Sequence, residues 1–248
     1  MPTTATTILI AGGLAAVHLF AGKLRFLAVV PRSQYLSMAG GVSVAYVFVH
    51  LLPEISERQS ELAVDAGAPA ATELPLFLVA LFGFTVFYGL EQFVVQSRRT
   101  AEGRQVVSAF ETNASALAFW LHVSSFALYN ALVGYLSLHR EESGLAAAAL
   151  YFVAMALHFV VNDHGLREHH REAYVHLGRW ILALAVVGGV LAGVLVDVPE
   201  LALGYLLAFL GGSVVLNAIK EELPEERRSS FGAFGAGVVA YTLVLLSV

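Results

Sequence analysis

The chain has 248 residues, of which 58% are hydrophobic and only 13% are charged, and its mean hydropathy is +0.73. Charged residues make up about a quarter of ordinary soluble domains, so this composition excludes a soluble globular protein and predicts an integral membrane protein. The absence of cysteine excludes disulfide bonds, thiolate metal ligands and cysteine nucleophiles. A net charge of -5 argues against a nucleic-acid partner.

Eight apolar segments separated by charges are predicted to be transmembrane helices, each of which needs about 20 residues to cross a bilayer. Because eight helices use most of the chain, we expect one all-α transmembrane domain over residues 1–248. The lipid bilayer is then its main partner. The expected segments cover about 6–30, 35–54, 74–96, 109–137, 144–166, 175–196, 201–222 and 230–248.

The basic residues follow alternate segments. All 14 Lys and Arg residues except Arg58 and Arg140 come after the first, third, fifth or seventh segment. Short cytoplasmic loops carry an excess of basic residues, so both termini are predicted to lie outside. The connection from 54 to 74 then becomes an acidic outer loop, which either concentrates cations or is merely solvated.

Two segments share a motif. Residues 40–54 read GGVSVAYVFVHLLPE and residues 211–225 read GGSVVLNAIKEELPE, with Gly-Gly and Leu-Pro-Glu at the same spacing. The copies lie on an even and an odd segment, so they would cross the membrane in opposite directions. This predicts a 3+2+3 inverted repeat, with repeat one at about 6–96, central helices at about 109–166 and repeat two at about 175–248. Such repeats build many transporters, although the motif can also serve helix packing alone.

The central helices carry polar residues at helical spacing, and ionisable groups in a membrane are costly and usually functional. Imidazole and carboxylate groups suit zinc, iron or nickel, and a methionine would add a softer ligand. In the alternative interpretation, His122 and His158 are only hydrogen-bonded within a helix bundle. The fourth segment contributes Glu111, Ser115, His122, Ser125 and Tyr129, and the fifth contributes Tyr151, Met155, His158, Asn162 and Asp163.

Other polar residues lie nearer the ends of segments. His50 in one copy of the repeat corresponds to Glu221 in the other, and both are interpreted as gate or interface residues. Four histidines after the fifth segment form either a weak metal-collecting loop or a solvated surface: His164, His169, His170 and His176. The sequence contains no phosphate-binding loop, GxSxG or HExxH motif, so we expect neither an enzyme nor a resident cofactor.

This pattern resembles the ZIP (Zrt/Irt-like protein) family of divalent metal transporters. The resemblance covers nearly the whole chain through its eight predicted spans, outside termini and inverted repeat. It includes the phrases FVHLLPE at 48–54, LEQFVV around Glu91 and LPE at 223–225. It implies a metal path between the fourth and fifth spans, with a signature on each.

Only the leading histidine of each signature is kept. HVSSFA at 122–127 stands where the family has His-Asn-x-x-Asp or Glu-Gly, and HFVVND at 158–163 stands where it has His-Glu-x-Pro-His or Glu-Glu or Gly. Several ligand positions are therefore apolar, and the sixth segment offers no acid for a second metal. The resemblance implies at most one metal site, formed by His122, His158 and Asn162 with Asp163 or Met155 assisting.

Three hypotheses follow. The first is a divergent ZIP-like carrier that moves a divalent cation of the zinc or iron class into the cytoplasm. The second is a carrier of another small polar solute or of protons, and the third is a ZIP-like membrane protein that acts as a sensor or assembly partner without transport. Short loops favour a prokaryotic plasma membrane, and glycine-rich faces are compatible with a homodimer.

Overall fold

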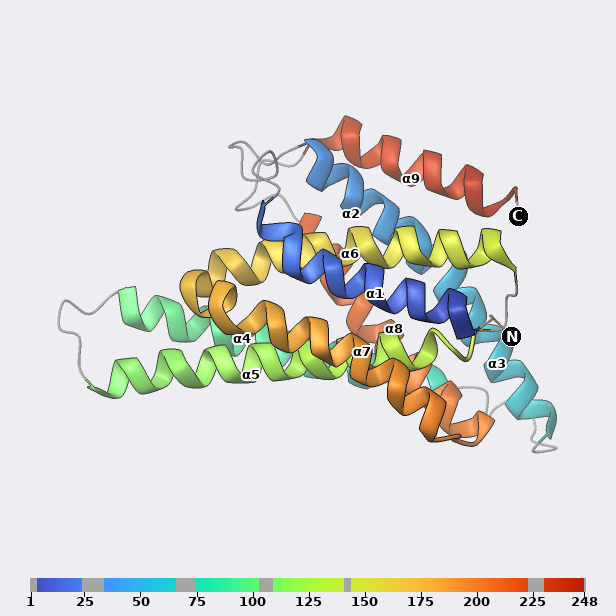
Figure 1. The fold of residues 1–248 in the computed structure, drawn as a ribbon, viewed down its shortest axis with the longest axis horizontal. Coiled ribbons are helices and arrows are strands. Elements are labelled where there is room, and N and C mark those ends of the chain that lie inside the picture. Colours follow the sequence, from blue (N-terminus) through green and yellow to red (C-terminus); the bar gives the residue numbers. More distant parts are fainter. Residues whose placement is uncertain are drawn as a thin grey trace.

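The computed structural model describes residues 4–23, 34–65, 75–102, 109–140, 144–222 and 230–247. All regular structure in these ranges is helical, which confirms the expected all-α class. Figure 1 shows the helices packed roughly side by side, with both chain ends at the same end of the molecule. The elements are α1 (Thr4–Phe20), η1 (Ala21–Lys23), α2 (Gln34–Tyr46), η3 (Val47–Leu51), α3 (Leu52–Asp65), α4 (Pro75–Glu102), α5 (Ala109–Leu136), α6 (Leu145–Ala173), η5 (Tyr174–Gly178), α7 (Arg179–Leu195), α8 (Glu200–Glu222) and α9 (Phe231–Leu245).

Among the described residues, six helical stretches are long and apolar enough to cross a membrane. They are Thr6–Lys23, Gln34–Ser60, Pro75–Phe93, Ala116–Leu136, Leu145–Leu195 and Glu200–Lys220. The longest stretch consists of two helices, α6 and α7. The backbone leaves helical geometry at Arg171, and the chain turns back there (Figure 1). The last helix, α9, is apolar but shorter. This architecture fits an integral membrane protein.

The second expected segment ends later than the sequence indicated. Helical structure runs from α2 through η3 into α3, which ends at Asp65, so residues 54–65 do not belong to a loop. The charged α3 contacts α8 through Arg58, which lies 3.5 Å from Glu200. In addition, the Gln59 side chain accepts a hydrogen bond from the backbone N–H of Leu76. The remaining part of the expected acidic loop, 66–74, lies outside the described residues.

The helices form two groups by their closest packing. In the first, which we call the inner bundle, α5 packs along α7, and α1 packs against both α6 and α7. In the second, the outer bundle, α2 packs along α9, α4 packs along α8, and α3 packs against α8. The bundles meet chiefly where α2 lies against α6 and α4 lies against α5. Any path between them therefore passes α2, α4, α5, α6 and α8.

Glycines set the distance between paired helices of the outer bundle. A Cβ atom on Gly41 would collide with the backbone of α9, and one on Gly237 would collide with the backbone of α2. The same reciprocal contact joins Gly212 of α8 and Gly83 of α4. Gly41 and Gly212 are each the second glycine of the repeated Gly-Gly motif. In both copies the motif thus brings two helix backbones into direct contact.

Replacing Gly212 with alanine is expected to destabilise the fold, because the added methyl group meets the Ala80 carbonyl oxygen. Overpacking of this kind costs about 1–3 kcal/mol. The apparent melting temperature in detergent, followed by circular dichroism, should fall by several degrees. Gly188→Ala is the control, since a Cβ there meets no described atom within 4 Å. Equal melting temperatures for the two variants would contradict this account of the contact.

Candidate functional site

The four predicted metal ligands are all buried between helices, but they do not form one cluster. His122 lies on α5, and His158, Asn162 and Asp163 lie on α6. Each side chain is at most 6% exposed. The structure divides them among three separate polar groups, each with its own additional partners.

His158 and Asn162 form the first group, one helical turn apart on α6. Asn162 Nδ2 lies 2.9 Å from His158 Nε2. Since an amide NH₂ group can only donate, His158 accepts through Nε2 and carries its proton on Nδ1. The Tyr129 ring lies beside this histidine, with ring centroids 5.7 Å apart. His158 is therefore a neutral imidazole whose basic nitrogen faces a weak, exchangeable donor, which is a suitable state for a metal ligand.

Asp163 belongs to a second group with His18 of α1. His18 Nδ1 lies 2.9 Å and 3.0 Å from the two carboxylate oxygens of Asp163. His18 Nε2 lies 3.1 Å from Asn130 Oδ1 on α5, while the amide nitrogen of Asn130 donates to the Phe126 carbonyl at 2.7 Å. The His18 ring also stacks on Phe159 at 4.5 Å. Asp163, which was expected to assist as a metal ligand, thus contacts His18 through both carboxylate oxygens and joins α1 to α6.

His122 belongs to a third group that joins four helices. Its Nε2 lies 3.6 Å from Glu91 Oε2 on α4, and its Nδ1 lies 3.0 Å from His170 Nε2 on α6. The same Glu91 oxygen lies 2.7 Å from the ammonium of Lys220 on α8. The charge of Lys220 acts on both His122 and His158. The Lys220 ammonium and the His122 imidazole therefore share one carboxylate oxygen of Glu91.

A cavity of about 270 Å³ opens between the two bundles at one end of this path. Its walls come from α2, η3, α3, α6, α8 and the end of α5. Met155, which lies one helical turn before His158, is part of its lining. The polar lining residues are Tyr46, His50, Glu54, Glu57, Arg58, His139, Arg140 and Tyr151.

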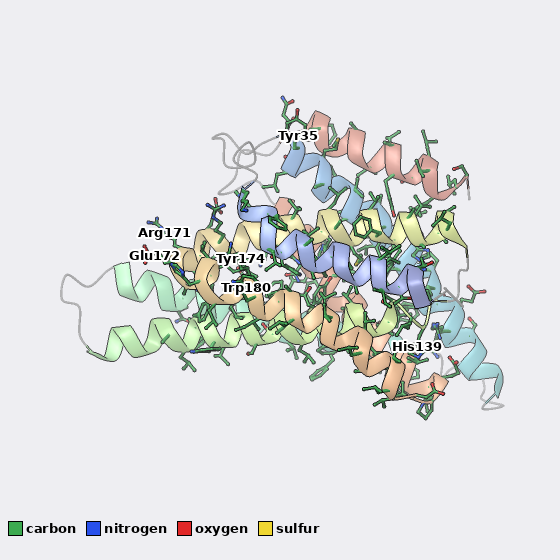
Figure 2. The ribbon with its side chains drawn as sticks, viewed as in Figure 1. Tyr35, His139, Arg171, Glu172, Tyr174 and Trp180 are labelled. Atoms are coloured by element: carbon green, nitrogen blue, oxygen red, sulfur yellow. The ribbon has the colours of Figure 1, made fainter. Side chains whose placement is uncertain are left out.

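The cavity and the turn after α6 lie at different ends of the molecule. Figure 2 shows His139 toward the end that carries α3, and Arg171, Glu172 and Tyr174 where α6 gives way to α7. Glu54 at the cavity is held 3.6 Å from Arg58 and 4.0 Å from His50. His50, predicted as a gate residue, is thus placed at the cavity.

The four histidines expected in a loop are not in one. α6 continues to Ala173, so three of them lie on that helix, and His176 follows in η5. Two of the four contact the predicted ligand His122: His170 Nε2 lies 3.0 Å from His122 Nδ1, and the His169 ring lies edge-on to the His122 ring with centroids 6.0 Å apart. His169 also donates to the Gly165 carbonyl, and His164 pairs with Glu168 at 3.4 Å. Within the described ranges, no three His, Cys, Asp or Glu side chains are placed to hold one metal ion.

Sequence reasoning missed His18, did not connect Asn130 with it, and did not connect Glu91 with Lys220. For His18 the signal was present, because any ionisable residue within an apolar span is a candidate for function. The other connections depend on which helices are neighbours, and residue spacing does not report that. Glu111 and Ser115 of the predicted stripe have side chains outside the described set.

The His18–Asp163 pair is expected to behave as one energetic unit. Removing either partner leaves the other polar group buried without compensation, which typically costs about 3–5 kcal/mol. We expect His18→Ala and Asp163→Ala each to lower the free energy of unfolding in detergent by about this amount. The double variant should lose clearly less than the sum of the two losses. Strict additivity would show that the pair contributes no coupling.

Comparisons of the chain with protein-family models, curated proteins and solved structures find no significant match. The assignment of a function therefore depends on the residues and contacts described above. The most informative of these are the cavity between the bundles, the neutral His158 one helical turn from its lining residue Met155, and the group of Glu91, His122 and Lys220.

Proposed function

We propose that this protein is a ZIP-like secondary carrier that moves a divalent cation of the zinc or iron class between its two helix bundles. The observation that carries this proposal is the cavity between the bundles, whose lining reaches Met155, one turn from the neutral, buried His158. A carrier needs a polar site that can be reached from one side of the membrane and closed from the other. The cavity, with the buried His158 one helical turn from its lining residue Met155, supports a site of this kind.

The matched packing of the helices supports a 3+2+3 inverted repeat with eight spans. If α1, the α2–α3 unit and α4 correspond to α7, α8 and α9, the packing of α2 on α9 corresponds to that of α8 on α4. Likewise, the packing of α5 on α7 corresponds to that of α6 on α1. The reciprocal contacts of Gly41 and Gly212 with their partner helices follow the same correspondence. Shared packing partners are what a duplicated, inverted unit would produce.

The chemistry of the site favours weak, transient binding of a cation. His158 offers a nitrogen ligand after Asn162 turns away, the Asn162 carbonyl oxygen can replace the donated N–H, and Met155 adds sulfur toward the cavity. Glu54 and His50 lie at the cavity and provide a first contact for an arriving cation. Low ligand charge at the buried position favours release over retention, which suits transported cargo better than a resident cofactor.

Replacing His158 with alanine should abolish most cation uptake, because it removes the buried imidazole one helical turn from the cavity-lining Met155. In proteoliposomes loaded with a fluorescent chelator, we expect initial rates of Zn²⁺ or Fe²⁺ uptake to fall by about tenfold or more. His122→Ala should also reduce uptake, since it opens the contact between α5 and α4. His176→Ala is the control, as this histidine is exposed in η5. A folded wild type that carries neither ion would refute the divalent-cation proposal.

One observation favours a second candidate function. The ammonium of Lys220 lies 2.7 Å from the Glu91 oxygen that also approaches His122, and this positive charge opposes entry of a divalent ion. A small polar solute or a proton would not meet that repulsion to the same degree. Uptake of no metal together with proton flux driven by a membrane potential would select this candidate. Absence of both fluxes would favour a sensor or assembly role.

We further propose that the protein lies in a prokaryotic plasma membrane with both termini outside. The basic residues that follow alternate segments support this orientation, and both chain ends lie at the same end of the molecule (Figure 1). The large apolar side chains exposed on α1, α4, α5, α7 and α9 then face lipid.

This orientation can be tested directly, because the natural chain has no cysteine. Single cysteines at Asp197 and Ser247, both exposed, should react with a membrane-impermeant maleimide on intact cells. A cysteine at exposed Glu172 should react only after the cells are opened. The cysteine-free chain controls for background labelling. The reverse labelling pattern would invert the proposed topology.

A further inference from the structure

One carboxylate oxygen of Glu91 is shared by two groups that come from different bundles. Glu91 Oε2 lies 2.7 Å from Lys220 Nζ on α8 and 3.6 Å from His122 Nε2 on α5. Glu91 and Lys220 both belong to the outer bundle, whereas His122 belongs to the inner bundle. Glu91 is only 15% exposed and His122 only 4% exposed. The oxygen therefore sits at the contact between the bundles, largely shielded from solvent.

The separation between Glu91 and His122 is informative. At 3.6 Å the two atoms are too far apart for a good hydrogen bond. Two tetrahedral ligands that each lie about 2.1 Å from a zinc ion are about 3.4 Å apart, which is close to the observed separation. If His122 donates its Nδ1 proton to His170, 3.0 Å away, its Nε2 lone pair faces Glu91. The pair can then provide one nitrogen and one oxygen ligand.

Without a metal ion, the positive charge beside Glu91 and His122 is supplied by Lys220. A buried carboxylate without a cation is costly, and the ammonium at 2.7 Å removes that cost. Lysine carries its charge on a long flexible stem, and Lys220 lies in the last turn of α8, so its ammonium can swing toward the membrane surface. A divalent ion that reached Glu91 would repel the ammonium and displace it.

We propose that Glu91 and His122 form a cation-binding pair and that Lys220 is a tethered cation that occupies it until a divalent substrate ion displaces the ammonium. This inference rests on the proposed function and deepens it, because it adds a ligand from α4 and assigns Lys220 the role of a competitor. Lys220 thereby sets specificity: only an ion of higher charge density than an ammonium gains enough to replace it. It also keeps Glu91 neutralised when no substrate is bound.

Removal of the competitor should raise cation affinity, and this can be measured without transport. Co²⁺ is titrated into the purified full-length protein in detergent, and binding is followed by its visible absorption bands. Lys220→Met, which keeps side-chain length without charge, should bind Co²⁺ about tenfold or more tightly than wild type. Lys220→Arg should stay near wild type. Lys23→Met is the matched control, as Lys23 is the other lysine of the chain and packs over Phe20.

The gain must depend on the proposed ligands. Adding Glu91→Gln or His122→Ala to Lys220→Met should remove it. An affinity unchanged in Lys220→Met, or a gain that survives Glu91→Gln, overturns the proposal. If Lys220→Met does not elute as a monodisperse species, Lys220→Gln takes its place, because it also removes the charge while keeping a polar head at the end of the helix.

The binding and uptake experiments can fail independently. If the variants change Co²⁺ affinity as expected but the wild type carries no metal, the carrier function is wrong and the tethered-cation site stands. If the wild type carries metal but Lys220→Met leaves both Co²⁺ affinity and uptake unchanged, the carrier function stands and the role assigned to Lys220 is wrong.

Discussion

Polar and charged side chains inside an apolar helix bundle must find partners on other helices, because hydrocarbon offers none. In the described part of this chain, several such contacts connect different helices. The His18–Asp163 pair joins α1 to α6, the Glu91–Lys220 pair joins α4 to α8, and Arg58 joins α3 to α8. The glycines set how closely paired backbones approach. Polar contacts and small residues thus both contribute to the packing of the helices.

The positions of most helices were predictable from the sequence, since apolar runs and the charges that end them report local burial. The prediction was wrong for 54–65, because α3 is stabilised by contacts that Arg58 and Gln59 make with distant parts of the chain. It was also wrong for the histidine-rich segment, where α6 continues to Ala173 despite several charged residues. Both errors arise where tertiary contacts stabilise a helix whose own composition resembles a loop.

For the candidate site, the sequence pointed to four side chains on two helices that are all buried, but not to their partners. The His158–Asn162 contact follows from helical periodicity, because residues four apart share a face. The His18–Asp163 contact does not, since it requires α1 to lie beside α6. In the same way, the His122–His170 contact exists only because α6 stays helical as far as residue 170. Spacing within one helix is local information, whereas helix adjacency is a property of the whole fold.

The contacts within each bundle differ in kind from those between the bundles. Within the bundles, the structure has the buried His18–Asp163 contact, the partly buried Glu91–Lys220 ion pair and direct backbone contacts at glycine. Between them, the ring contacts of Phe87 with Phe126 and Tyr129 are typical, and such contacts are worth about 0.5–1.5 kcal/mol each. The hydrogen bond from Tyr241 to the Leu150 carbonyl adds one polar link.

The plane between the bundles contains the cavity and the Glu91–His122 contact. In the proposed carrier, motion along this plane would preserve the pairs that hold each bundle together. It would also change the distance between Glu91 and His122, because these residues lie on opposite sides of the plane. A cation held by both would hold the bundles together, and the ammonium of Lys220, which belongs to one bundle only, would not. Substrate binding would thereby be coupled to the relative position of the bundles through the two residues that share it.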